Sequence, residues 1–241
     1  GYAAQLQAQL ASVSRTITLD RLQASLAASG HASPTVAVQN DPPRVIISST
    51  PAILVPIHGA PVWKPVPGAA SFQRVINTRA LILKSASEPQ VFMKVYDGWL
   101  MANSLDGPWT QPFIPPTGID AAAKQVAATG VVDVLDGGPR ANPRPALAQG
   151  VPAIYTSQVP AELIVFKGAP DFAPIVGTGL MWATNTNGDV LRAGAAGDYY
   201  VLLAGRWFRS AALTGPWSFV ASNALPPDFA RIPPGSLAGA V

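Results

Sequence analysis

The chain has 241 residues, of which 49% are hydrophobic and 12% charged, so it carries enough apolar surface to bury a core and is not a disordered, charge-rich tail. Its 21 Gly and 25 Pro residues argue against a helix-dominated fold, and the absence of cysteine excludes disulfides, zinc–thiolate sites and a cysteine nucleophile. The formal net charge of +3 comes from dispersed basic residues, a pattern that argues against nucleic-acid binding.

Residues 1–40 are expected to form an N-terminal helix and strand segment. Apolar residues at helical spacing begin it: Tyr2, Leu6, Leu10 and Val13. Residues 15–19 alternate as a strand does, whereas Leu19, Leu22 and Leu26 continue a helical pattern to Gly30, so the type of this second element stays open. The N-terminus lacks the basic and apolar regions of a signal peptide. No apolar stretch approaches the length of about 20 residues that spans a bilayer, so we expect no membrane-spanning segment.

An internal repeat organises the rest of the chain. Residues 45–110 match residues 154–218 with a single one-residue deletion. The matches include Pro51 with Pro160, Asn77 with Asn185, Trp99 with Trp207, and Gly107-Pro108-Trp109 with Gly215-Pro216-Trp217. Because two rare tryptophans recur at the same spacing in both segments, chance is a poor explanation. The sequence therefore predicts a duplicated module.

Each copy is predicted to be a meander of about five short strands. In the second copy the expected strands are residues 162–166, 180–184, 199–203, 206–210 and 217–220. Asn187-Gly188 and Ala204-Gly205 are the expected hairpin turns between them. In the first copy the corresponding hairpin uses residues 79–84 and 91–95, and Asp97-Gly98 takes the second turn.

These patterns predict a mainly β protein of two homologous, small antiparallel β modules, with an N-terminal helix and a connecting helix. The modules are expected at residues 41–116 and 153–241, the latter ending in a Pro-rich tail. Between them, residues 117–152 hold a helix at 119–128, which ends before Gly130, and a linker or exposed loop rich in Gly and Pro.

No catalytic or metal-binding motif is present in the sequence. His31 and His58 lack a second histidine or a cysteine at ligand spacing, and there is no Gly-x-Ser-x-Gly elbow and no phosphate-binding loop. Single aspartates lie in or beside predicted turns, where this residue commonly bonds its own backbone: Asp97, Asp106, Asp189 and Asp198. We therefore predict no catalytic residue, no metal and no cofactor, while a polysaccharide hydrolase with a site assembled in space stays an alternative.

The aromatic residues are the remaining candidates for a site. Tryptophan and tyrosine rings present a flat surface on which sugar rings or a peptide stack, but such side chains also fill the cores of small β modules. The recurrence of both tryptophans favours a core role for at least one of each pair. Arg206 and Arg209 have no basic counterpart in the first copy and indicate a surface particular to the second copy. The candidate ligand-binding residues are Trp182, Tyr199, Arg206, Trp207 and Arg209.

Four segments, at residues 74–83, 160–165, 199–210 and 213–217, resemble a group of larger exported bacterial proteins labelled carbohydrate-binding family V/XII. The resemblance implies export to the periplasm, the outer surface or the medium. It also implies a non-catalytic role and a chain that is part of a longer precursor. It carries over no site residues.

Three functions follow as hypotheses. The first is a non-catalytic binding or scaffold module of an exported bacterial protein, with a glycan or a protein partner. The second is a structural protein–protein interaction subunit of a larger envelope or extracellular assembly, and the third is a polysaccharide hydrolase. Exposed, coplanar Trp207 and Trp182 rings favour binding, whereas two carboxylates about 5–10 Å apart in a cleft favour hydrolysis.

Overall fold

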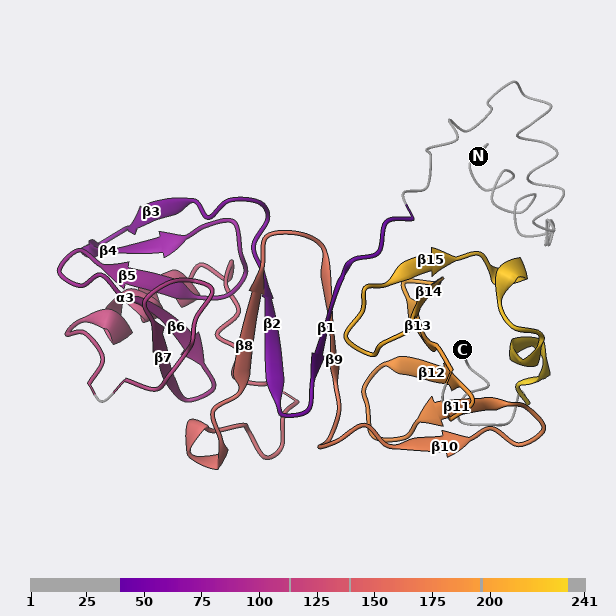
Figure 1. The fold of residues 1–241 in the computed structure, drawn as a ribbon. Coiled ribbons are helices and arrows are strands. Elements are labelled where there is room, and N and C mark those ends of the chain that lie inside the picture. The colour runs from indigo at the N-terminus through magenta and orange to yellow at the C-terminus, as the bar shows by residue number, and fades with distance from the viewer. Residues whose placement is uncertain (1–39, 113, 139, 196, 234–241) are drawn as a thin grey trace, which may run out of the picture. The chain divides into compact units, whose positions relative to one another are not determined.

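The computed structural model describes residues 40–112, 114–138, 140–195 and 197–233, coloured in Figure 1. These residues form fifteen β-strands, one α-helix and three short 3-10 helices, so the fold is mainly β with sheets of antiparallel strands. The helix expected at residues 2–14 and the ambiguous segment that follows it lie outside the described residues. Within the described part of the chain, no helix is long and apolar enough to cross a membrane.

The first sheet has five antiparallel strands in chain order, each hydrogen-bonded to the next. They are β3 (Trp63–Val66), β4 (Ala69–Val75), β5 (Ile82–Ser85), β6 (Val91–Val95) and β7 (Gly98–Ala102). Val95 pairs with Gly98, so the two turn residues are Tyr96 and Asp97 and not the expected Asp97-Gly98. Tyr96 takes the left-handed conformation, with φ 53°, that a tight hairpin of this length requires.

The second sheet is a six-stranded antiparallel meander, also in chain order. Its strands are β10 (Phe172–Pro174), β11 (Leu180–Ala183), β12 (Asp189–Ala193), β13 (Tyr199–Leu203), β14 (Arg206–Ser210) and β15 (Ser218–Val220). The hairpin predicted at Ala204-Gly205 is confirmed, with both turn residues at positive φ between paired Leu203 and Arg206.

Four further strands form two parallel pairs. They are β1 (Arg44–Ser48), β2 (Ala52–Pro56), β8 (Ala153–Ser157) and β9 (Ala161–Val165). The strand expected at residues 162–166 is one of them, β9, so it does not belong to the second meander as predicted, because its backbone pairs with a strand that precedes the first sheet. Strand β1 pairs with β9, and β2 pairs with β8 (Figure 1). Each pair therefore joins one strand that precedes the first sheet to one strand that precedes the second.

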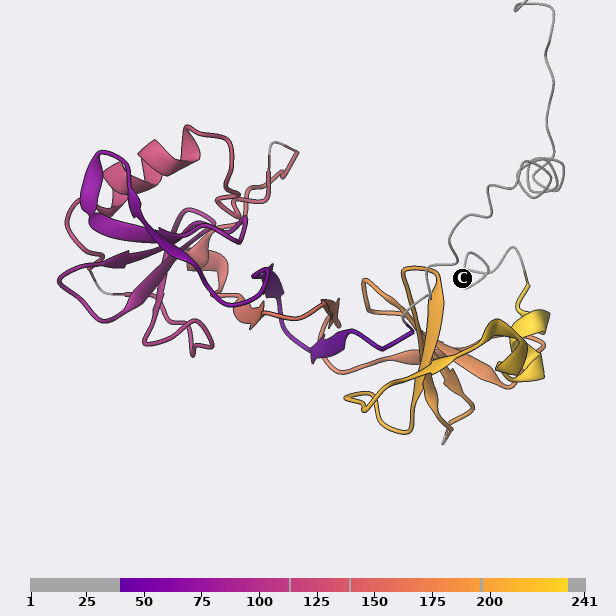
Figure 2. The ribbon, with the colours of Figure 1, turned by 90° about the horizontal axis from the view of Figure 1, so that it is seen from above.

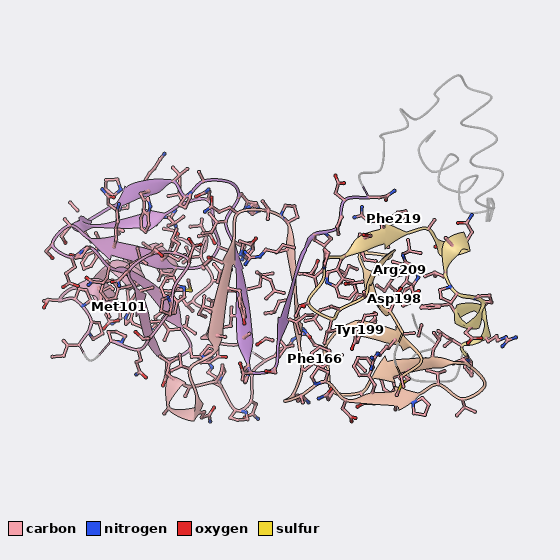
Figure 3. All side chains as sticks on the ribbon, in the orientation of Figure 1. Met101, Phe166, Asp198, Tyr199, Arg209 and Phe219 are labelled. Atoms are coloured by element: carbon pink, nitrogen blue, oxygen red, sulfur yellow. The ribbon has the colours of Figure 1, made fainter. Side chains whose placement is uncertain are left out.

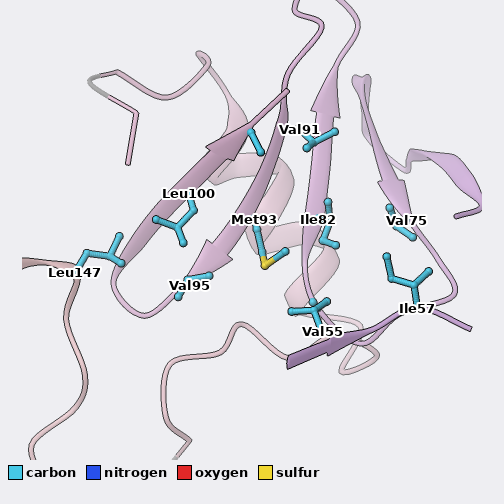
Figure 4. Packing of buried hydrophobic residues seen from close by; sticks show 11 residues of the cluster. Val55, Ile57, Val75, Ile82, Val91, Met93, Val95, Leu100 and Leu147 are labelled. Atoms are coloured by element: carbon cyan, nitrogen blue, oxygen red, sulfur yellow. The ribbon is translucent and has the colours of Figure 1, made fainter. Parts of the chain in front are cut away.

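The packing of these strands crosses over between the two halves of the chain. Val45 and Ile47 of β1 pack against the core of the second sheet, where Val201 and Phe208 are fully buried. Conversely, Ile154 of β8 packs against the core of the first sheet. Figure 4 shows the buried residues of that core, with Val55 near Ile82 and Ile57 beside Val75. Each core thus contains a strand from the other half, an arrangement we call the strand exchange.

Backbone hydrogen bonds extend the strand exchange symmetrically beyond the paired strands. Ile57 N donates to Ser157 O at 2.8 Å, and Phe166 N donates to Ser48 O at the same distance. At the opposite ends, Arg44 N donates to Pro160 O and Ala153 N donates to Pro51 O, both at 2.9 Å.

The other face of each sheet is covered by a different element. Helix α3 (Ile119–Ala127), which lies inside the segment predicted as a helix, packs Ala122 and Val126 against Phe72 and Leu83 of the first sheet (Figure 2). The second sheet is covered by residues 225–232, which include the 3-10 helix η3 (Pro227–Arg231) and follow η2 (Ser222–Ala224).

The segment expected as a linker or exposed loop is anchored to the first sheet. It contains the 3-10 helix η1 (Leu147–Gln149), and Leu147 is buried in the first core. Its backbone N donates to Asp97 Oδ1 at 2.9 Å, which ties the segment to the β6–β7 turn. The sequence did not predict the burial of Leu147, because a single leucine among Pro, Gly and polar residues shows no periodicity.

Each sheet has a proline on its first, outer strand. Pro65 lies on β3 and Pro174 on β10, and both strands are paired on one side only. Because proline lacks an N–H, an edge strand that carries it is a poor template for a further strand.

Replacing Pro65 and Pro174 together by Val is therefore expected to accelerate aggregation at high protein concentration. The free energy of unfolding should change by less than about 1 kcal/mol, because each proline side chain is exposed. Light scattering during incubation, compared with urea denaturation of the same samples, separates the two effects. Pro61→Val, outside any strand, is the control, and equal scattering from both variants would show that the edge prolines have no protective role.

Candidate functional site

The five predicted site residues lie on two different faces of the second sheet. Trp182 and Trp207 belong to the face covered by residues 225–232. Arg209 projects from that same face, because alternate residues of a strand share a side. Tyr199 packs on the opposite face, against the core that receives β1, and Arg206 alternates to that side. The structure therefore does not bring these residues together in one site.

Trp207 lies in a core and is not the exposed ring that ligand stacking requires. Its side chain is only 9% exposed, and the ring of Phe229 stands edge-on to it with centroids 5.0 Å apart. Phe229 makes a second edge contact with Tyr200, also at 5.0 Å. The condition that would favour ligand stacking, exposed and coplanar Trp207 and Trp182 rings, is therefore not met at Trp207, because the C-terminal segment covers that side of the sheet. Its burial agrees with the core role expected for at least one tryptophan of each recurring pair. Trp182 is half-buried in the same cluster.

Tyr199 is engaged by its neighbours on the other face. The guanidinium of Arg192 lies 4.9 Å from the centre of its ring, and the Phe172 ring packs at a tilt with centroids 5.9 Å apart. A sugar stacking on Tyr199 would have to displace one of these partners. Figure 3 places Tyr199 beside Asp198 and Arg209 at the start of β13 and the end of β14.

Arg209 is held by an ion pair at the surface. Its Nε lies 3.6 Å from Asp198 Oδ2, and the two side chains are 55% and 40% exposed. Exposed pairs of this kind contribute little to stability, because water and salt screen the charges.

Replacing Arg209 by Gln is therefore expected to change the free energy of unfolding by less than about 1 kcal/mol. Urea denaturation at low and high salt measures this, and the difference from wild type should shrink as salt rises. A salt-independent loss of several kcal/mol would contradict the surface role.

Three of the other four tryptophans also pack against neighbouring groups. Trp99 is buried, and its Nε1 donates to Asp120 Oδ1 at 2.9 Å. Trp217 is buried with Phe208, and its Nε1 has no hydrogen-bond partner in the described part of the chain. The half-buried Trp63 carries the Lys84 ammonium 4.5 Å from its ring centre.

Many of the aspartates accept hydrogen bonds that hold local structure. Asp228 Oδ2 accepts from Gly179 N at 2.7 Å, and Asp171 Oδ2 accepts from the Thr184 hydroxyl at 2.9 Å. Backbone N–H groups close by in the chain bond Asp133 and Asp136. No group of three or more His, Cys, Asp or Glu side chains that could hold a metal ion occurs among the described residues.

The structure shows a cavity that the sequence did not indicate. It is a hollow open to solvent, beside α3 and the first sheet, with a volume of about 380 Å³. Its lining combines apolar and charged side chains: Leu81, Lys94, Asp120, Ala123, Lys124, Ala127 and Val134. On α3, Asp120, Ala123 and Lys124 have the spacing that places residues on one helix face. This spacing is the one indication of the site that could have been read from the sequence. A second, more polar depression of about 350 Å³ is lined by Gln73, Lys84, Ser85 and Glu88.

Comparison with known proteins adds no relative: no protein-family model, no curated protein and no solved structure matches the chain.

Proposed function

We propose that this chain is a non-catalytic binding or scaffold module of an exported bacterial protein. The observation that carries the proposal is the strand exchange, because the core of each sheet is packed against by partly buried side chains from a strand of the other half of the chain. Such reciprocal packing suits a module that holds its two sheets in one folding unit for assembly with other proteins.

The proposal includes the duplication of one β module, which each copy modifies by lending its first strand to the other. Support comes from strands that recur at matching positions, such as β6 with β13 and β7 with β14. The side-chain bonds recur as well. Asn77 Nδ2 donates to the carbonyls of His58 and Ala60, while its Oδ1 accepts from Val62 N. Asn185 makes the same three bonds to Lys167, Ala169 and Asp171.

A protein partner is favoured over a glycan within this proposal. Stacking on a sugar needs accessible aromatic faces. The rings of Trp99, Trp207 and Trp217 are buried. Export, and membership of a longer chain, rest on the resemblance to the carbohydrate-binding family V/XII proteins. The role as a structural subunit of an envelope or extracellular assembly is the protein-partner form of the same proposal.

A glycan array and a polysaccharide digestion assay test the proposed function together. We expect no release of reducing ends from any polysaccharide; turnover would overturn the non-catalytic role. Binding on the array that Trp182→Ala abolishes would establish the glycan form, since Trp182 is the half-buried tryptophan of the predicted site. An array without binding would exclude the glycan form and leave the protein partner.

A further inference from the structure

We propose that the cavity beside α3 and the first sheet binds a small amphipathic carboxylate. The apolar part of the ligand would lie on the aliphatic lining, and its carboxylate would bind Lys94 and Lys124. This inference goes beyond the proposed scaffold role and stands independently of it, because the cavity lies apart from the strand exchange and from the aromatic residues of the second sheet.

The lining of the cavity has the composition of a small-molecule site. Leu81, Ala123 and Val134 provide an apolar surface, and charged groups stand only at Lys94, Asp120 and Lys124. Its volume of about 380 Å³ lies within the range of about 300–1,000 Å³ that is usual for ligand pockets, in which a few polar groups orient a mostly apolar ligand.

The charge at the cavity is matched to an anion. Within the described residues neither Lys94 nor Lys124 takes part in an ion pair. The one carboxylate of the lining, Asp120, already accepts a hydrogen bond from the buried Trp99 indole. The lining thus holds two ammonium groups and one carboxylate, an excess of one positive charge, and an incoming carboxylate would receive charge-assisted hydrogen bonds from the lysines.

Lys94 occupies a position that the second sheet gives to an apolar residue. In the first sheet Lys94 pairs across the strands with Trp99, and in the second sheet Leu202 pairs in the same way with Trp207. Leu202 packs there with Phe229 in the core. The first sheet therefore has an ammonium group beside α3, where the second sheet has an apolar side chain, and a bound anion would pair with it.

The Lys94 ammonium is also held in place for a ligand. Its Nζ donates to Asp97 O at 3.2 Å and lies 5.4 Å from the centre of the Trp99 ring. An ammonium has three donors, so this single hydrogen bond leaves two for an anion.

Calorimetric titration of the full chain with hexanoate, hexanol and hexylammonium tests the ligand class. Hexanoate should bind at least about tenfold more tightly than hexanol, and hexylammonium should not bind. Equal affinity for hexanoate and hexanol would overturn the proposal. So would the absence of binding heat from hexanoate at concentrations up to about 10 mM, because a dissociation constant above that value is too weak for a specific site.

Variants place the binding at this cavity. Lys124→Gln, at an exposed position, should weaken hexanoate about tenfold, whereas Lys167→Gln on the other half of the chain should leave it unchanged. Lys94→Leu, which copies the residue of the second sheet, should abolish binding while leaving the melting temperature unchanged or higher. If Lys94→Leu instead lowered the melting temperature and retained hexanoate binding, Lys94 would be a structural residue and the site would be excluded.

Discussion

Replacing Ile47 by Asp is expected to destabilise the second sheet, although Ile47 precedes every strand of the first sheet in the chain. The side chain packs with Val45 against the core of the second sheet. Removing its apolar contacts and placing a carboxylate there should lower the free energy of unfolding by about 3 kcal/mol. Hydrogen exchange followed by mass spectrometry should show that the exchange rate, relative to wild type, increases more in β13 and β14 than in β6 and β7.

The reciprocal substitution, Ile154→Asp, should have the opposite distribution. Ile154 precedes the second sheet in the chain but packs against the first core. Its exchange increase should therefore appear in β6 and β7. In each variant, the increase in exchange rate should therefore appear in the sheet against which the substituted strand packs, and not in the sheet that follows that strand in the chain.

Glu162→Gln on β9 is the control for this pair, because its side chain is exposed on one of the exchanged strands. It should leave exchange in both sheets within experimental error. If Ile47→Asp accelerated exchange in the first sheet alone, β1 would belong with the strands that follow it and the exchanged packing would be wrong.

Replacing Asn77 by Ala is expected to lower the free energy of unfolding by about 3 kcal/mol. The amide side chain makes three hydrogen bonds of 2.8 to 2.9 Å that fix the residues before β3, and each such bond contributes about 1 kcal/mol. Asn185→Ala should cost a similar amount, because its three bonds hold the corresponding segment before β10. Urea denaturation measures both values.

Asn187→Ala is the matched control for the asparagine pair. Asn187 is close to Asn185 in the chain, yet the described structure gives its side chain one hydrogen bond, from Val165 N to Oδ1 at 2.8 Å. Its expected cost is about 1 kcal/mol. Equal losses for Asn185→Ala and Asn187→Ala would mean that the three-bond geometry does not set the stability of this segment.

Local pattern predicted much of the two meanders. Strands β13 and β14 follow from apolar segments on either side of a two-residue turn, and β6 follows from the apolar segment before the turn that leads to β7. The turn predicted at Asp97-Gly98 in the first sheet was wrong by one residue. Asp-Gly is a strong turn signal in isolation, but the pairing of Val95 with Gly98 makes Tyr96 and Asp97 the loop residues.

The candidate site shows what composition alone leaves open. Tryptophans and arginines close together in the chain indicated a common surface, yet Arg206 and Arg209 are an odd number of residues apart on β14 and so point to opposite faces. That separation was available from the sequence. The burial of Trp207 was not, because it depends on Phe229, which reaches the sheet from the C-terminal segment.

By itself, the sequence determined the mainly β class, the matching segments, and strands such as β13 and β14 with the turn between them, because apolar runs and turn residues act over a few positions of the chain. Only the tertiary structure decided that β1 pairs with β9 and β2 with β8, and that α3 leaves a charged cavity over the first sheet. The physical reason is that all four of these strands are short apolar segments whose local pattern is satisfied by more than one partner. Their pairing is therefore selected by the cores that they complete together, which lie far apart in the chain.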